Sequence, residues 1–361
     1  MRIGPQRPYP IAAQLSEVSM RRREFIKITA GTIATASLAS LSAVAASGKA
    51  ITVDALQLDL YRRVRRYAKT PFGDIAYIDV GSVRRVALLL HGFPLNSFQW
   101  RDVIDRVCMY RRCIAPDFLA MGYTRTNDGQ DVGPESQVAM LVSLLDTLAI
   151  SSVDIIASDS GGAIAQLFVV KHPERVRTLL LTNCDSEIES PPNALLPVIE
   201  LAKQGKYADQ WLAPWLANKA LARSKDGIGG LCYSDPTKPT DEAIEMYFAP
   251  LLASSDRKAL VERYVIALER NPLSGIEQDL KRSTVAARIV WGMADTIFSA
   301  ASAEYLDRTF GKSRGIRRVE SGKLFWPEEY PAIISEEALE LWNVSLLCPD
   351  SQCEESPGLA T

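Results

Sequence analysis

The stretch "VDIIASDSGGAIAQ", residues 153–166, contains the side chains best placed to do chemistry. An apolar run typical of a buried strand leads into small residues and then into a helical pattern, so the chain must turn sharply near Asp159 and Ser160. Such a turn lifts one side chain above the end of the strand, where a substrate can reach it. A carboxylate in that place can attack an sp³ carbon, displace a halide or open an epoxide, and leave an ester on the enzyme.

The nucleophile of this turn has two possible positions. With Ala157 and Gly161 as its small neighbours, the nucleophile is Asp159, and shifted by one residue it is Ser160. The length of the strand and the start of the helix favour Asp159. The alternative without chemistry is that Asp159 caps the helix, a position at which aspartate is common.

Two further motifs, "LLLHGFP" at 88–94 and "WGMAD" at 291–295, stand on either side of this turn in the chain. The three motifs together resemble the α/β-hydrolase superfamily, and an aspartate at the turn resembles its haloalkane dehalogenase and epoxide hydrolase branch. The resemblance covers nearly all of the chain after its N-terminal leader. It implies that the backbone N–H groups of Phe93 and Ser160 stabilise developing negative charge, and that His91 is structural.

The same resemblance implies a base that activates water and an acid that orients the base. The acid is expected at Asp295, with Asp185 as the alternative, and the base is expected in "ESGKLFWPEEYP" at 320–331, where Lys323 replaces the histidine of the family. A lysine has an ordinary pKa of about 10.4, against about 6.5 for histidine, so Lys323 holds its proton at neutral pH and cannot accept another. We expect Lys323 to have Asp295 as its partner, in a buried ion network that also includes Asp159.

Three functions are compatible with these residues. The leading hypothesis is a hydrolase that acts on a small, largely apolar substrate through Asp159, with altered chemistry at Lys323. The second is a catalytically silent small-molecule-binding protein, and the third is a serine hydrolase that uses Ser160 with Lys323 as the base.

Apolar runs alternate with amphipathic stretches along most of the chain. Buried strands are expected at 75–80, 86–90, 113–118, 153–158, 176–183, 287–292 and 316–319. Helices are expected up to about residue 107 and at 135–148, 161–171, 300–309 and 335–344. This alternation predicts an α/β fold with a mostly parallel sheet that is covered by helices on both faces.

The alternation of strands and helices stops at about Cys184 and resumes after Val285. We expect a helical lid at 185–285, inserted into a core made of 47–184 and 286–345, and a flexible tail at 346–361. In this lid, Trp211 and Trp215 lie four residues apart, on one helical face, and are candidates to line a pocket; Tyr247 is a third candidate.

The N-terminal residues 1–46 combine "RRREFIK", a weakly apolar run and small residues, which resembles an extension followed by a twin-arginine-type signal peptide. The protein is therefore expected in the periplasm or outside the cell, with membrane contact only during export. The net charge of -2 gives no electrostatic reason to expect a nucleic-acid partner. No cofactor or metal is expected, and of the six cysteines Cys348 and Cys353 are the most plausible disulfide pair.

Overall fold

A computed structural model of the chain describes residues 53–344. The expected signal peptide and the Cys348–Cys353 pair lie outside the described residues. The chain divides into a segment that ends at Leu56 and a unit from Gln57 to Thr361, and all the interactions discussed below belong to the second unit. None of the described helices is long and apolar enough to cross a bilayer.

The centre of the described structure is one sheet of nine strands. The strands are β1 (Arg65–Thr70), β2 (Gly73–Val80), β3 (Val86–Leu90), β4 (Arg112–Pro116), β5 (Arg125–Thr126), β6 (Val153–Asp159), β7 (Val176–Cys184), β8 (Ala286–Gly292) and β9 (Ser313–Val319). Their order is β1-β2-β4-β3-β6-β7-β8-β9, with β5 paired to β2. All pairs from β4 to β9 are parallel, whereas β2 is antiparallel to each of its partners.

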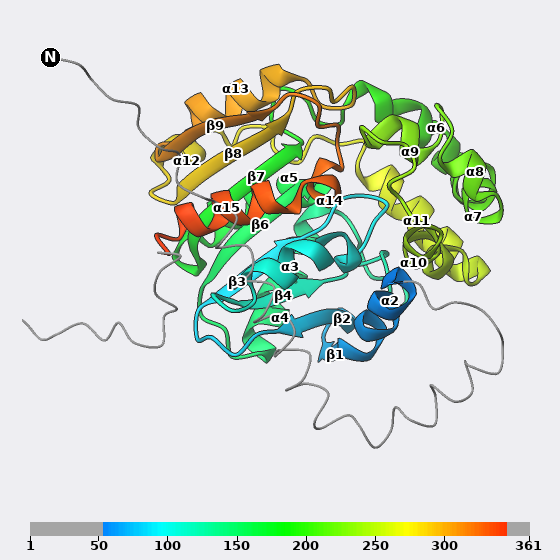
Figure 1. Cartoon of the computed structure of the whole chain (residues 1–361), viewed down its shortest axis with the longest axis horizontal. Helices are drawn as coiled ribbons and strands as arrows, with labels where there is room; N and C mark the ends of the chain where they lie inside the picture. The colour runs from blue at the N-terminus through cyan, green and yellow to red at the C-terminus, as the bar shows by residue number, and fades with distance from the viewer. Residues whose placement is uncertain (1–52, 345–361) are drawn as a thin grey trace, which may run out of the picture. The chain divides into compact units, whose positions relative to one another are not determined.

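Helices cover both faces of this sheet. Those outside the lid region are α2 (Val53–Val64), η1 (Ser97–Trp100), α3 (Arg101–Val107), α4 (Pro134–Thr147), α5 (Ser160–Lys171), η2 (Pro173–Arg175), α13 (Ala300–Thr309), α14 (Trp326–Glu329) and α15 (Pro331–Leu341). Helices α3 and α15 pack against each other in front of the strands in Figure 1, and α4 packs against α5. Because both faces are covered, the central strands β3 and β6 are buried along their whole length. The predicted fold class is confirmed.

The lid segment, residues 185–285, contributes no strand to the described sheet. Its elements are η3 (Asn193–Leu195), α6 (Leu196–Lys203), η4 (Ala208–Leu212), α7 (Ala213–Ala217), α8 (Lys219–Ala222), α9 (Ile228–Cys232), α10 (Asp241–Leu252), α11 (Ser255–Ala267) and α12 (Glu277–Arg282). Helices α6 to α11 gather at one end of the strands, on the right of Figure 1. Side chains Thr240 and Ser254 cap α10 and α11 by accepting hydrogen bonds from the backbone of the first turn.

Two strands of the sheet were not predicted from the sequence. Strand β1 reads "RRYAKT" and is mostly exposed, as an edge strand can be, so it lacks the apolar run by which the other strands are recognised. Strand β5 has only two residues. The last helix begins at Pro331, earlier than expected, because proline fits the first turn of a helix.

Candidate active site

The junction of β6 and α5 is a sharp turn centred on Asp159. Asp159 has φ 55° and ψ -134°, a conformation that non-glycine residues rarely adopt, whereas Ser160 is the first residue of α5. The turn requires close approach of the backbones around it. A Cβ atom on Gly92 would lie 2.7 Å from the Cβ of Asp159, and one on Gly161 would lie 2.5 Å from the carbonyl oxygen of His91. We call residues 157–162 the elbow.

The Asp159 carboxylate is held by backbone amides. The N–H of Phe93 donates to Oδ2 at 2.9 Å, and the N–H of Ser160 also stabilises the charged form. The side chain forms no hydrogen bond of the N-cap type to α5 in the described structure. The two amides that were expected to stabilise negative charge therefore face the carboxylate itself, and the Phe93 N–H fixes its Oδ2.

Three carboxyl groups share this region of the protein. Burial raises the pKa of Asp159 well above its ordinary range, and the charges of Asp185 and Asp295 raise it further, against the two amides. Burial also raises the pKa of Asp185 to about 6 and that of Asp295 to about 6. None of the three carboxyls forms an ion pair with a described residue, so no nearby cation lowers their pKa values.

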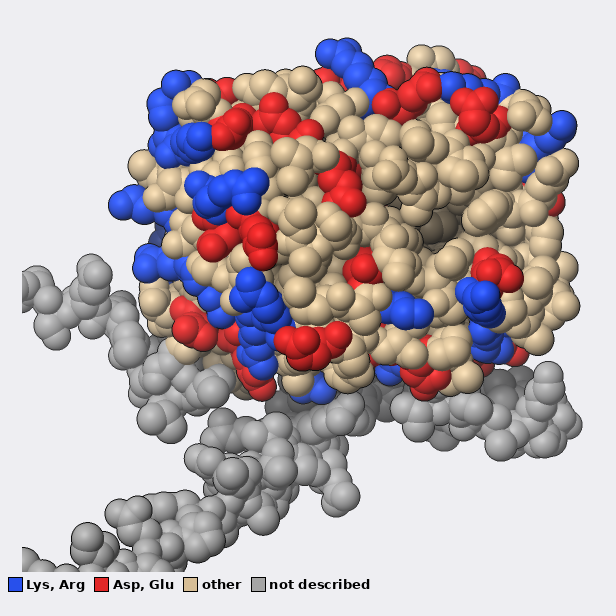
Figure 2. All heavy atoms as spheres, turned by 90° about the horizontal axis from the view of Figure 1, so that it is seen from above, with Lys and Arg blue, Asp and Glu red and all other residues tan. Residues whose placement is uncertain are grey.

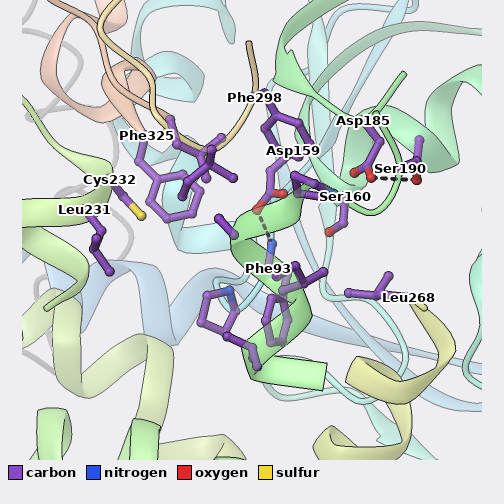
Figure 3. A pocket seen from close by; sticks show the side chains of 18 of the residues that line it. Phe93, Asp159, Ser160, Asp185, Ser190, Leu231, Cys232, Leu268, Phe298 and Phe325 are labelled. Atoms are coloured by element: carbon purple, nitrogen blue, oxygen red, sulfur yellow. Dashed lines mark hydrogen bonds between the residues drawn. The ribbon is translucent and has the colours of Figure 1, made fainter. Parts of the chain in front are cut away.

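A cavity of about 270 Å³ lies beside the elbow, between the sheet and the lid segment. Its walls are mainly apolar, and Asp159, Ser160 and Asp185 are among the few polar side chains that face it (Figure 3). Trp211 and Trp215 both line it and pack edge to face, with ring centroids 5.6 Å apart. A recess among uncharged residues is visible on the face shown in Figure 2.

Tyr247, expected as a pocket residue, does not line this cavity. Its hydroxyl donates to Oε2 of Glu328 at 2.8 Å, and its ring packs against Phe98. Tyr233 donates to the other oxygen of Glu328 at 2.6 Å, and Arg101 forms an ion pair with the same carboxylate at 2.5 Å. Tyr247 thus belongs to a buried hydrogen-bond network away from the elbow.

Two tyrosines that sequence reasoning missed, Tyr207 and Tyr264, line the cavity instead. Both rings pack against Phe93, with centroid distances of 5.7 and 5.6 Å. The hydroxyl of Tyr264 donates to Oγ of Ser160 at 3.2 Å, whereas that of Tyr207 has no hydrogen bond to a described residue. Burial raises both pKa values, so both hydroxyls keep their protons at neutral pH and can donate them.

Asp295 follows β8, where its motif predicted it. Its Oδ2 accepts from the side-chain amide of Asn183 at 2.8 Å, and its Oδ1 accepts from the N–H of Ile297 at 2.9 Å. Asn183 also bonds to both the N–H and the carbonyl of Gly292. Asp295 is therefore held firmly, and it is not among the residues that line the cavity.

Lys323 does not form the expected ion network. Its ammonium group donates to the carbonyl oxygen of Gly230 at 2.7 Å, in α9 of the lid segment. Within the described residues it has no ion pair with Asp159 or Asp295. A backbone carbonyl of the lid thus takes the place that we expected the two carboxylates to have.

The loop that carries Lys323 is joined to the lid segment at many points. We call these hydrogen bonds, between residues 321–329 and 230–235, the lid seam. Besides the Lys323–Gly230 bond, they are Phe325 N–H to Cys232 O at 2.9 Å, Ser234 Oγ to Ser321 O, Ser234 N–H to Glu329 at 3.0 Å, Asp235 N–H to Glu329 at 2.9 Å, and Tyr233 OH to Glu328. This loop therefore anchors the lid.

Both histidines of the chain lie in the described part, and neither lines the cavity. His91 is fully buried; its Nδ1 is 2.9 Å from the carbonyl of Gly92, and its Nε2 accepts from the N–H of Phe118. Burial lowers its pKa, so it is neutral. His172 lies at the C-terminal end of α5, near Glu174. The groups that can accept a proton from water in the cavity are therefore carboxylates.

Comparisons with known proteins agree with this architecture. Residues 86–226 match the model of the family described as alpha/beta hydrolase fold. A solved structure of the epoxide hydrolase CorEH superposes with a TM-score of 0.63 at 18% identity, over 77% of this chain and 98% of that one. An identity this low speaks for the fold alone.

Two relatives with higher identity match shorter stretches. The chain is 40% identical over 105 residues to a 2-hydroxy-6-oxo-2,4-heptadienoate hydrolase of Pseudomonas putida, which covers 28% of this chain and 38% of that protein. It is 35% identical over 102 residues to a haloalkane dehalogenase of Mesorhizobium japonicum, covering 28% of this chain and 33% of that protein. The chain thus matches well under two thirds of the length of either relative.

Proposed function

Because the chain has the α/β-hydrolase fold and is similar to hydrolases of that superfamily, we propose that it is a hydrolase that opens small, apolar epoxides through a carboxylate nucleophile, Asp159. One observation carries the proposal. The side chain with the strained elbow conformation is a carboxylate held by amides, and it faces an apolar cavity that also contains two tyrosine hydroxyls.

The choice of Asp159 over Ser160 rests on the elbow geometry. The positive φ falls on Asp159, and strain of this kind persists only where the surrounding structure enforces it. The Oγ of Ser160 accepts a hydrogen bond from the Tyr264 hydroxyl, and no histidine lines the cavity to activate Ser160.

The choice of an epoxide rests on the two tyrosines. When Oδ1 of Asp159 attacks an epoxide carbon, the carbon–oxygen bond of the ring breaks and the electron pair stays on the epoxide oxygen. That oxygen then takes the proton of Tyr207 or Tyr264, and a hydroxyalkyl ester remains on Asp159. A halide would leave as an anion and would need no proton, so the hydroxyls favour the epoxide.

A second candidate function is the binding of a small molecule without catalysis. The position of Lys323 favours this alternative. The side chain expected to act as the base is bonded to the lid, so any ester formed on Asp159 needs another base. The test below distinguishes the two candidates.

The test uses the full chain, a small aryl or alkyl epoxide, diol analysis and intact mass. The wild type should release diol and carry a transient adduct on Asp159. Asp159→Asn should lower both by about a thousandfold or more, because an amide is a poor nucleophile. Ser160→Ala, a matched change one residue away, should stay within about tenfold of the wild type.

Two outcomes would contradict the proposal. A fluorophosphonate adduct on Ser160, with Asp159→Asn still active, would assign a serine hydrolase. Epoxide binding without adduct or diol in the wild type would assign the silent binding protein.

A further inference from the structure

Resting on the proposed function, we propose that Asp185 is the general base that activates water to hydrolyse the ester on Asp159, the task for which relatives were expected to use a histidine. The proposal concerns the second half of the reaction. The first half, alkylation of Asp159, does not depend on it.

The sheet places Asp185 next to the nucleophile. Strands β6 and β7 are parallel neighbours, and Asp159 is the Cα partner of Cys184, one residue before Asp185. Both aspartates are 8% exposed, and both line the same cavity. Figure 3 shows both aspartates near Ser160, with the Asp159 carboxyl directed towards the Phe93 amide and the Asp185 carboxyl towards Ser190.

The Asp185 carboxylate is oriented by its own neighbours. Oγ of Ser190 donates to its Oδ1 at 2.7 Å. The side-chain amide of Gln166 donates to the backbone carbonyl of Asp185 at 2.8 Å and to that of Gly162 at 3.0 Å, which ties the end of β7 to the helix of the elbow. Oδ2 accepts no hydrogen bond from another described residue, so it is available to a water molecule.

No other described group combines these properties. Both oxygens of Asp295 accept hydrogen bonds from the protein, and this residue does not line the cavity. His91 is saturated with backbone hydrogen bonds, and Lys323 is a cation bonded to the lid. Asp185 is the carboxylate that faces the cavity and is not the nucleophile.

Oδ2 of Asp185 takes a proton from water while the water oxygen bonds to Cγ of Asp159, and the ester carbonyl becomes an oxyanion. The N–H groups of Phe93 and Ser160 already face this position. The oxyanion collapses, the bond to the alkyl oxygen breaks, and that oxygen takes the proton from Asp185. The water oxygen stays in the Asp159 carboxyl, and the second water proton passes from that carboxyl to the tyrosine that had lost its proton, which restores both groups.

The electrostatic surroundings of Asp185 suit this role. Its pKa near 6, raised by burial, leaves the group mostly ionised at neutral pH while it remains a better proton acceptor than an exposed aspartate. The titratable groups facing it are Asp159 on β6, Cys184 on β7, Glu189 in the following loop and Tyr264 on α11. All four are acids, and none supplies a positive charge that would lower the pKa.

The experiment separates the two halves of the reaction by mixing excess epoxide with the full chain and following the adduct by intact mass. Asp185→Asn should form one ester per chain about as fast as the wild type and then hydrolyse it about 100-fold or more slowly. Formation of the ester also proves that the variant is folded. In H₂¹⁸O, the wild type should gain ¹⁸O in Asp159 during a single turnover.

Asp295→Asn is the comparison variant, because it makes the same change in a carboxyl with a similar pKa outside the cavity. Its hydrolytic phase should slow by less than about tenfold. A second readout is the pH profile of the wild-type hydrolytic phase, which should rise through a pKa near 6.

The other outcomes would contradict either the role of Asp185 alone or the whole proposed function. If Asp185→Asn hydrolyses its ester like the wild type, or if the wild-type ester never hydrolyses, Asp185 is not the base, although alkylation of Asp159 stands. If the wild type forms neither ester nor diol, the proposed function fails and the base with it.

Discussion

Residues of the elbow and of the lid seam line the same cavity, but the two regions are built in opposite ways. At the elbow, Asp159 has a strained backbone, and its carboxyl shares a buried region with those of Asp185 and Asp295, none of which forms an ion pair with a described residue. At the lid seam, the polar groups find partners: Glu328 accepts from Arg101, Tyr233 and Tyr247, and Lys323 donates to a carbonyl.

This contrast indicates which of the two regions is the better candidate for a reactive site. Strained and poorly compensated groups persist at functional sites, because only function maintains them, whereas satisfied networks are typical of structural regions. By this criterion the ends of β6 and β7 are the candidate site for the proposed chemistry. The loop after β9, where relatives were expected to hold a base, serves to fasten the lid.

The largest predicted difference between the elbow and the lid seam is a dependence of the free energy of unfolding on pH, caused by Asp185 beside the elbow. The pKa of an ordinary aspartate, as in the unfolded chain, is 3.8, whereas that of Asp185 in the folded protein is about 6. Folding therefore favours the protonated form of Asp185. Through this group, the folded protein is more stable at low pH than at neutral pH. This contribution of Asp185 to stability is fully present below about pH 4 and is lost as the pH rises to about 6. It amounts to at most about 3 kcal/mol, at about 1.4 kcal/mol per pKa unit.

Asp185→Asn removes this titration. Its free energy of unfolding in urea should therefore exceed that of the wild type by about 1 to 3 kcal/mol at pH 7.5, with the difference shrinking towards pH 4. A constant difference across this pH range would mean that Asp185 has an ordinary pKa, and the elbow would lose its electrostatic distinction from the seam.

The elbow could be predicted from the sequence because its signal is local. Strand, small residues and helix follow one another within residues 153–166, so a single stretch specifies the position of the turn. The partners of the elbow are not local. Tyr207 and Tyr264 come from different parts of the lid segment, and both rings pack against Phe93.

The seam was misjudged for a related reason. The motif at 320–331 predicted correctly where the loop lies but gave no information on what Lys323 contacts, since Gly230 belongs to a segment that no motif relates to it. Similarity of motif was taken to imply the same partner, Asp295. In the structure, the ammonium group donates to the backbone carbonyl of Gly230 in the lid and not to Asp295.

A smaller effect concerns the two cavity tyrosines. Tyr207→Phe and Tyr264→Phe should each slow epoxide opening by about tenfold to a hundredfold, because a general acid contributes about 10²–10⁴ and each can partly replace the other. Alkylation by a bromoalkane of similar size should change little, since bromide leaves without a proton. Rates of adduct formation by rapid quench and intact mass measure both.

Tyr247→Phe is the matched control, because it removes a hydroxyl of the same kind outside the cavity. It should leave epoxide opening nearly unchanged and lower the free energy of unfolding by about 1 to 2 kcal/mol through the lost bond to Glu328. Equal losses on the epoxide and the bromoalkane in the Tyr207 and Tyr264 variants would show that these tyrosines shape the cavity without donating a proton.

The smallest expected effect is at Lys323, and it tests the comparison from the side of the seam. Lys323→Met keeps most of the side-chain length but removes the bond to Gly230. The free energy of unfolding should fall by about 1 kcal/mol, because a half-buried carbonyl loses a charged donor. Hydrogen exchange should rise in residues 230–235, while ester hydrolysis on Asp159 changes by less than about tenfold.

Lys312→Met makes the same change at an exposed lysine whose ammonium group has no hydrogen bond to a described residue, and it should alter neither the stability nor the exchange in residues 230–235. The decisive result is the hydrolytic phase. If Lys323→Met accumulated the ester while exchange in the lid stayed constant, the ammonium group would be acting on the reaction and not on the lid. The loop after β9 would then share the chemistry of the elbow, and Asp185 could not be its sole base.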